Sequence, residues 1–164
     1  MKELPQYKLD PKIKAVWRIS DAIMLTIVFF CIFLVGGIAW LVEPTTHGWS
    51  GPYCLICLIV YVACMIGFMA VVSPLRYIRW RYEMSKDYLD IANGIIWRKR
   101  TMVPFIRVQN TDTKQGPILR AFGLASVTVS TAAGSMEIPG LRADEAEEVR
   151  DKAAELARLA KEDV

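Results

Sequence analysis

The sequence contains a single histidine, His47, and this scarcity limits the chemistry that can be predicted. No serine-histidine-aspartate triad is predicted, because the one histidine is expected on the opposite side of the membrane from the C-terminal domain. The P-loop and the dinucleotide-binding fingerprint are both absent. A structural zinc site wants two pairs of ligands, and His47 is the one nearby candidate beside the cysteines. The sequence therefore predicts a protein that is not an enzyme and that holds no metal or cofactor.

Charge is absent from two long segments, residues 22–42 and 53–75. At the helical rise per residue each segment reaches about 30 Å, the thickness of a bilayer hydrocarbon core. The first segment is longer than the apolar part of a signal peptide, and no small-residue cleavage site follows it. We therefore predict that two transmembrane helices form a hairpin over residues 22–75.

Lys and Arg are also absent from the loop between these segments, residues 43–52, whereas residues 1–21 contain five. The positive-inside rule places this loop outside the cell membrane and both termini in the cytoplasm. The predicted domains are thus a cytoplasmic N-terminal segment, the hairpin, and a cytoplasmic domain over 76–164. The aromatic residues expected at the outer interface are Trp40, Trp49 and Tyr53, and those at the inner interface are Trp17, Tyr77 and Trp80.

Cysteine is scarce, with four residues, two of which form a C-x-x-C at Cys54 and Cys57. A thioredoxin-type motif opens a helix after a strand, and the apolar segment around this pair lacks that setting. We favour the interpretation that these small side chains pack one helix against its neighbour. The alternative is an outward-facing disulfide or thiol sensor, which predicts a phenotype for Cys54→Ser or Cys57→Ser.

Residues 76–142 show the pattern of short antiparallel strands. Asn93-Gly94 is a strong signal for a two-residue hairpin turn, so the next strand is expected to resume at Ile95. Alternation after Pro104 indicates that Ile106 and Val108 face a core. A single helical turn follows, and Gly123 is expected to end it.

From Ala143 the apolar period changes from two to 3.6 residues, which predicts a helix over 143–162. Its apolar stripe contains Val149, Ala153, Leu156 and Ala160. Packing on the sheet is the favoured role of this stripe, and a coiled-coil partner surface is the alternative. The predicted fold is two transmembrane helices followed by a mainly-β domain, in which two packed antiparallel sheets or a partly open barrel are capped by the C-terminal helix.

An ordered set of motifs runs through residues 87–134: a turn glycine, then P-x-x-R-V-Q, then GP-x-x-R-x-F-G-L, and a final T-A-x-G. The matching residues include Gly94, Pro104, Arg107, Gln109, Gly116, Pro117, Arg120 and Gly123. In this order and spacing they resemble the bacterial pleckstrin-homology-like (PH-like) family of membrane proteins often called YdbS-like. The resemblance implies a PH-like fold and a common companion, a larger membrane protein with several copies of the domain. It implies no catalytic activity.

The charges of the cytoplasmic domain are segregated. Residues 76–142 contain 11 Lys and Arg against 5 Asp and Glu, whereas residues 143–164 contain 4 against 8. A basic domain beneath the bilayer faces an anionic leaflet, where each nearby cation contributes about 1 kcal/mol. The candidate residues for docking a lipid headgroup or an acidic partner are Arg76, Arg79, Arg81, Arg98, Lys99 and Arg100. The alternative is that they signal topology and are otherwise solvated, and nucleic-acid binding is not predicted from so few basic residues.

The absence of a catalytic pattern and the PH-like fold favour protein–protein assembly at the membrane. The resemblance implies that the partner is a membrane protein with several PH-like domains, and this kind of protein suggests a role in envelope maintenance or stress tolerance. The PH-like fold offers an edge strand for β-augmentation and a groove beside the helix. An anionic-lipid-sensing module and the thiol sensor are the alternatives. A homo-oligomer is also open, because Gly36-Gly37 permits a close approach of helices.

Overall fold

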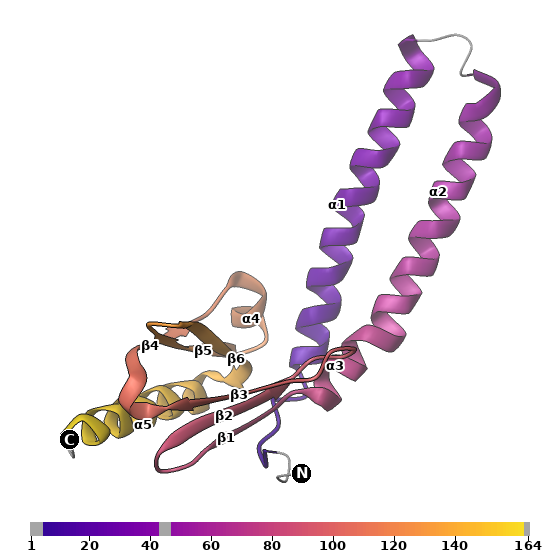
Figure 1. The fold of residues 1–164 in the computed structure, drawn as a ribbon. Coiled ribbons are helices and arrows are strands. Elements are labelled where there is room, and N and C mark those ends of the chain that lie inside the picture. The colour runs from indigo at the N-terminus through magenta and orange to yellow at the C-terminus, as the bar shows by residue number, and fades with distance from the viewer. Residues whose placement is uncertain (1–4, 43–46, 163–164) are drawn as a thin grey trace. The chain divides into compact units, whose positions relative to one another are not determined.

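The computed structural model describes residues 5–42 and 47–162, and the chain divides into two compact units. The helical unit is Trp17–Pro74. The sheet unit combines the residues up to Val16 with those from Leu75 onward. Figure 1 shows two long helices in the first unit, and two small sheets with a helix packed against them in the second.

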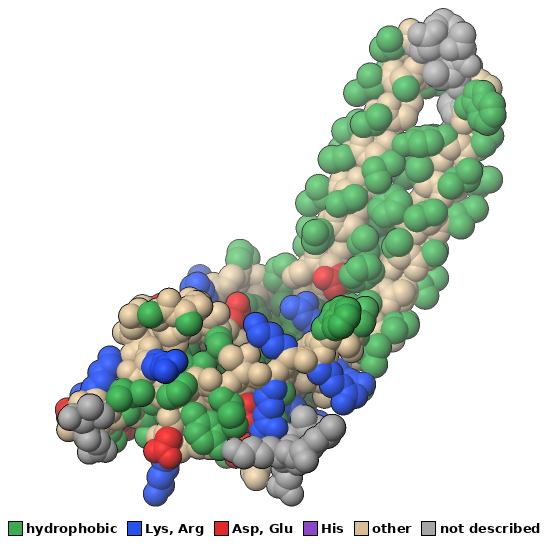
Figure 2. Space-filling model, in the orientation of Figure 1, with side chains coloured by type: hydrophobic (Ala, Val, Ile, Leu, Met, Phe, Trp, Pro, Cys, Tyr) green, Lys and Arg blue, Asp and Glu red, His purple; other side chains and the backbone are tan. Residues whose placement is uncertain are grey.

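Two helical stretches pass the length and composition test for crossing a membrane, Ile13–Val42 and Gly51–Arg79. On the face that Figure 2 shows, most side chains along these helices are apolar. The helical elements are α1 (Ile13–Val42), α2 (His47–Gly67), the π-helical turn η2 (Phe68–Val72) and α3 (Ser73–Arg79). The two predicted apolar segments are therefore confirmed as helices, and both helices extend beyond them.

The predicted loop over residues 43–52 is too long, because α2 already begins at His47 and contains Pro52. Proline lacks an N–H, but near a helix start this loss leaves only one exposed carbonyl without an intrahelical partner. Residues 43–46 lie outside the described part of the chain.

Within the helical unit, α1 and α2 contact each other through aromatic side chains. The ring of Tyr53 occupies the space where a Cβ on Gly36 would stand, and its hydroxyl donates to the carbonyl of Ile32 at 2.9 Å. Further along, the hydroxyls of Tyr61 and Thr26 are 3.0 Å apart. Gly36 thus serves close packing between the two helices of the hairpin.

The sheet unit contains two three-stranded antiparallel sheets, with strand orders β1-β2-β3 and β4-β5-β6. The first sheet consists of β1 (Arg81–Met84), β2 (Tyr88–Asn93) and β3 (Lys99–Pro104), and the second of β4 (Val108–Lys114), β5 (Leu124–Thr131) and β6 (Gly134–Arg142). The remaining elements are the 3₁₀ turn η3 (Phe105–Arg107), α4 (Pro117–Ala121) and α5 (Ala143–Glu162). The predicted mainly-β architecture and its terminal helix are confirmed.

The predicted two-residue turn at Asn93-Gly94 is wrong in length. Asn93 pairs with Lys99, so residues 94–98 form the loop and the next strand does not resume at Ile95. Gly94 has a φ of +104°, and the carbonyl oxygen of Trp97 occupies the space where its Cβ would stand. The loop therefore folds back on Gly94 instead of continuing the ladder.

The prediction that Ile106 faces the core is also wrong. Phe105–Arg107 forms a 3₁₀ turn, in which side chains three residues apart share a face. Phe105 is consequently 0% exposed and Val108 2% exposed, whereas Ile106 is 44% exposed. The alternating pattern of a strand does not apply across this turn.

Helix α5 packs on both the β4-β5-β6 sheet and η3, as predicted for a helix that covers a sheet. Its buried residues are Ala146, Ala153 and Ala157, so the buried face is rotated from the predicted stripe. Val149, Leu156 and Ala160 lie at the margin of this face with intermediate exposure. Alanine at the centre lets the helix backbone approach the sheet closely.

The N-terminal segment is part of the sheet unit, although the sequence suggested a separate segment over residues 1–21. Tyr7 exchanges two backbone hydrogen bonds of 3.0 Å with Tyr82, and the N–H of Asp10 donates to the carbonyl of Gly140 at 3.1 Å. Leu9 and Ile13 are 2% and 1% exposed. The chain therefore enters and leaves the helical hairpin from one and the same unit.

Candidate functional site

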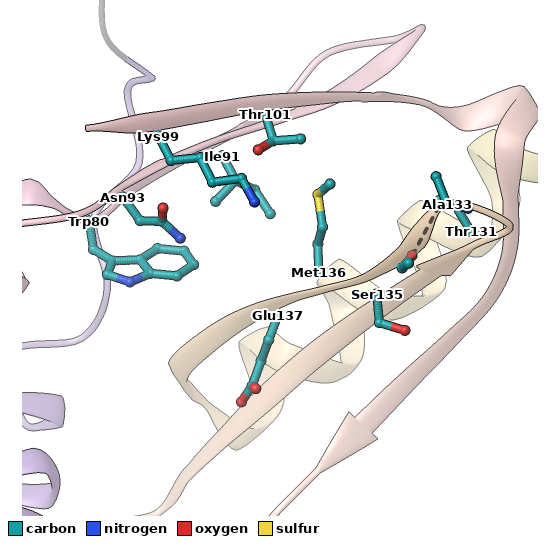
Figure 3. Close-up of a pocket in the computed structure, with 11 residues that line it drawn as sticks. Trp80, Ile91, Asn93, Lys99, Thr101, Thr131, Ala133, Ser135, Met136 and Glu137 are labelled. Atoms are coloured by element: carbon teal, nitrogen blue, oxygen red, sulfur yellow. Dashed lines mark hydrogen bonds between the residues drawn. The ribbon is translucent and has the colours of Figure 1, made fainter. Parts of the chain in front are cut away.

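A cleft of about 330 Å³ opens between the two sheets. One wall is formed by β2 and β3, and the other by the β5–β6 turn and the first residues of β6. In Figure 3, Met136 points from β6 across the cleft toward Ile91 and Thr101, and Trp80 lies near one end. The lining of the cleft thus combines apolar side chains, among them Ile91 and Met136, with polar ones such as Lys99 and Thr101.

Alternation along β3 divides the basic run Arg98–Arg100 among three places. Lys99 and Thr101 line the cleft, Arg98 lies in the preceding loop, and Arg100 is on the opposite face of the sheet. There Arg100 binds the carboxylate of Asp90, which is 2% exposed, with nitrogen–oxygen distances of 2.6 and 3.0 Å. These hydrogen bonds raise the pKa of Arg100 above its ordinary value. The guanidinium of Arg100 therefore forms an ion pair within the sheet and does not face the cleft.

The wall formed by the β5–β6 turn is held by side-chain hydrogen bonds. The hydroxyl of Thr131 donates to the carbonyl of Gly134 at 2.9 Å and accepts the N–H of Ala133 at 3.2 Å. The hydroxyls of Ser130 and Ser135 are 3.0 Å apart across the hairpin. This wall is consequently shaped before anything enters the cleft.

The outer edge of β3 borders the cleft and offers main-chain groups. Hydrogen-bonded pairs alternate along an antiparallel ladder, and the N–H of Phe105 donates to the carbonyl of Asp87. Counting back along the register, Val103 and Thr101 direct their main-chain groups toward β2, and Met102 directs its groups away from β2. Within the described residues, the N–H and carbonyl of Met102 have no strand partner on that side.

The lining of the cleft combines opposite charges with an adaptable apolar side chain. Lys99 and Glu137 place opposite charges among its lining residues, and the side chain of Met136 adapts to apolar shapes. In the described part of the chain, no group of three or more His, Cys, Asp or Glu side chains is placed to hold a metal ion. An extended segment beside Met102 would cover the mouth of the cleft with alternate side chains.

Comparison with known proteins identifies the family to which this chain belongs. The profile described as "Bacterial PH domain" matches residues 21–157. The UPF0699 transmembrane protein YdbS of Bacillus subtilis (strain 168) is 34% identical over 166 residues, which cover 100% of both chains. This chain belongs to the bacterial PH domain family. It is a transmembrane protein with two candidate spans, and no solved structure matches it.

The sheet unit, which comprises the residues up to Val16 and those from Leu75 onward, is called the PH domain from here on. The remaining predicted docking residues lie at the end of this domain where the chain leaves the second span. Arg76 and Arg79 are in the last turns of α3, and Arg81 opens β1. Trp80, between them, is only 7% exposed and lines the cleft. The prediction that Trp80 anchors the membrane interface is therefore wrong, because the fold of the PH domain buries it.

Most of the motif residues shared with the family have a backbone role. Gly116 and Pro117 begin α4, and the N–H of Gly123 donates to the carbonyl of Arg120 where this helix ends. Gly123 has a φ of +67°, the left-handed conformation expected of a helix-terminating glycine. Pro104 ends β3, and the side chains of Arg107, Gln109 and Arg120 are exposed.

Cys54 and Cys57 lie one turn apart in α2, and both are free thiols, as are Cys31 and Cys64. Cys54 is exposed in the chain taken alone, and Cys57 is half-buried. The side chain of His47 lies outside the described part of the structure. The role of this pair as helix packing or as a thiol sensor stays a prediction.

A second cavity of the PH domain, about 230 Å³, lies between the N-terminal segment, β1 and α5. Tyr82 at its centre is 4% exposed, stacks on Tyr7, and donates from its hydroxyl to Glu145 Oε1 at 3.0 Å. Burial, and next the negative charge of Glu145, raise the pKa of Tyr82 well above its ordinary value of 10.0. The neutral phenol is thus part of the attachment of the N-terminal segment to α5.

This raised pKa predicts a specific alkaline sensitivity. The stabilisation is complete below the pKa of an unfolded tyrosine and is lost as the pH rises toward the folded value, because only the unfolded chain releases the proton easily. The stability of the full-length chain in detergent should therefore fall between about pH 10 and 12, and Tyr82→Phe should make this decline shallower. Tyr88→Phe is the matched control, and an equal slope for both variants would contradict the assignment.

Proposed function

We propose that this chain is a non-enzymatic assembly subunit, whose PH domain binds an extended segment of a larger membrane protein that carries PH-like repeats. The observation that carries the proposal is the outward-facing main chain of β3 at Met102, next in the strand to Thr101, which lines the cleft. An added strand gains affinity from main-chain hydrogen bonds, and the cleft gives specificity through the side chains that enter it.

The site has the features expected for such a partner. Its volume accommodates a few side chains, and the hydrogen-bonded β5–β6 turn keeps the second wall in place. Lys99 and Glu137 favour a segment with charges of both signs around an apolar residue. The family resemblance supports a companion with several PH-like domains, and such a complex would serve envelope maintenance or stress tolerance.

The proposed topology has both termini and the PH domain in the cytoplasm of the cell. The backbone bonds between Tyr7 and Tyr82 support one part of it, because segments that pair must lie on the same side of a membrane. The excess of Lys and Arg in residues 1–21 over residues 43–52 supports the cytoplasmic side. A reporter that works only in the cytoplasm should be active when it is fused after Val164. Activity of a reporter that works only outside the cell, fused at the same position, would contradict this topology.

The assembly proposal is tested by substituting the edge of β3 in the tagged full-length chain. Met102→Pro removes the outward N–H without removing a bond to β2, whereas Met102→Thr keeps this N–H and serves as the matched control. Purification in mild detergent followed by mass spectrometry should recover a membrane protein with PH-like repeats from wild type and Met102→Thr. Recovery with Met102→Pro should fall about fivefold, which corresponds to the loss of about 1 kcal/mol.

A crosslink reports where the partner lies on the domain, whereas the purification reports how strongly it is held. A photoreactive amino acid at Thr101, in the cleft wall, should crosslink this partner, and the same group at exposed Arg120 on α4 should not. Equal recovery with Met102→Pro and wild type, together with no crosslink from Thr101, would overturn the proposed site. Purification of the chain without any other protein would overturn the assembly function itself.

A further inference from the structure

The loop between β2 and β3, residues 94–98, exposes two large apolar side chains at its tip. Ile96 is 85% exposed and Trp97 is 86% exposed. The next most exposed large apolar residue in the described part of the PH domain is Ile78, at 58%, and Ile78 lies in a candidate membrane span. A pair of such side chains at the tip of a short loop marks an interaction surface.

The loop has a defined shape that presents these side chains. Asn93 pairs with Lys99 at its base, and Gly94 holds the left-handed conformation that lets the carbonyl of Trp97 approach its backbone. A side chain at position 94 would collide with that carbonyl. The fold therefore turns Ile96 and Trp97 outward through a closed loop rather than through a frayed strand end.

The register places this loop at the end of the sheet where the chain leaves the second candidate span. That span ends at Arg79, and β1 begins at Arg81, which pairs with Ala92 near the end of β2. The loop follows β2 directly, and Figure 1 shows the β2–β3 turn at the same end of the first sheet as α3. Continuity of the chain thus brings the apolar tip to the domain end that adjoins a membrane.

The charges around the tip complement an anionic bilayer surface. Arg98 follows Trp97 directly, and Arg79 and Arg81 lie at the same end of the sheet. Tryptophan is enriched at membrane interfaces, and Arg beside an apolar anchor binds the phosphates of anionic lipids. Lys99 faces the cleft and is not counted among these charges.

We propose that the β2–β3 loop inserts Ile96 and Trp97 into the headgroup–acyl boundary of an anionic bilayer, with Arg98 at the level of the phosphates. The loop is a second attachment of the PH domain to the membrane, in addition to the chain connection at Arg79. It restricts the orientation of the domain and leaves the cleft between the sheets available. The proposal does not depend on the assembly partner.

The test places a fluorophore at the tip in the full-length chain. The four cysteines, Cys31, Cys54, Cys57 and Cys64, are changed to Ser, and Ile96→Cys is labelled with an environment-sensitive nitrobenzoxadiazole group. The chain is reconstituted in vesicles of phosphatidylcholine and phosphatidylglycerol. The matched control is Ile106→Cys, which is exposed on the 3₁₀ turn beyond the opposite end of β3.

Brominated lipid should quench the label at position 96 at least about twofold more strongly than the label at position 106. Aqueous iodide should quench the label at position 96 less than the label at position 106. Adding Arg98→Glu should reduce the lipid quenching at 96 and remove its dependence on phosphatidylglycerol. Equal access of iodide to both positions would overturn the proposal. Protection from iodide without quenching by brominated lipid would also overturn it, because protein rather than lipid would then cover the loop.

Discussion

Phe105→Ala is expected to destabilise the PH domain by about 3–5 kcal/mol, the range for removal of a fully buried phenyl ring. Phe105 is 0% exposed in the 3₁₀ turn η3, which contacts α5. Loss of the ring leaves a cavity at the point where the chain passes from the first sheet to the second.

The matched control is Ile106→Ala, one residue further along the same turn. Ile106 is 44% exposed, so its truncation should cost under about 1 kcal/mol. The measurement is the urea midpoint of the full-length chain in detergent, followed by protease resistance of the PH domain. A larger loss with Ile106→Ala would mean that the strand-like alternation predicted from the sequence is correct and the 3₁₀ turn is not.

Gly140→Ala is expected to loosen the N-terminal segment and to destabilise the PH domain by about 2–5 kcal/mol, from backbone strain and overpacking together. Gly140 has a φ of +64°, and a Cβ built there would stand 2.5 Å from Cδ1 and Cγ1 of Ile13. The carbonyl of Gly140 also accepts the N–H of Asp10. The substitution therefore acts at the place where residues 10–13 dock on β6.

Gly123→Ala separates strain from collision, because Gly123 has a similar φ of +67° but nothing within 4 Å of a built Cβ. Its cost should be limited to the strain of about 1–2 kcal/mol. Protease cleavage between the N-terminal segment and α1 should increase with Gly140→Ala and remain at the wild-type level with Gly123→Ala. Combined with Ile13→Ala, the total loss should be smaller than the sum of the two single losses, since the truncation removes two of the three colliding atoms although it costs stability by itself.

The docking of the N-terminal segment also bears on how the proposed assembly would act. Ile13 and Leu9 are buried in the PH domain, and α1 begins at Ile13 itself. The PH domain therefore contains both the start of α1 and the end of α3, because it is built from the residues up to Val16 and those from Leu75 onward. A partner that binds beside β3 would act on a domain attached to both ends of the helical hairpin.

Several features were determined by the sequence alone because they depend on residues close to one another in the chain. The uncharged runs 22–42 and 53–75 required helices of membrane length, and the change of apolar period at Ala143 set the start of α5. Gly116-Pro117 and Gly123 likewise marked the ends of α4 through local backbone preferences. The ordered motifs of residues 87–134 indicated the family correctly.

The tertiary structure alone decided which neighbours cover each residue. Pairing with Tyr82 and contact with Gly140 brought the N-terminal segment into the PH domain, across an intervening hairpin that local patterns cannot bridge. The pairing of Asn93 with Lys99 left Ile96 and Trp97 in an exposed loop, and Asp90 engaged Arg100 but not Arg98. Strand register and burial are sums over residues far apart in sequence, so a local pattern constrains the elements but not their contacts.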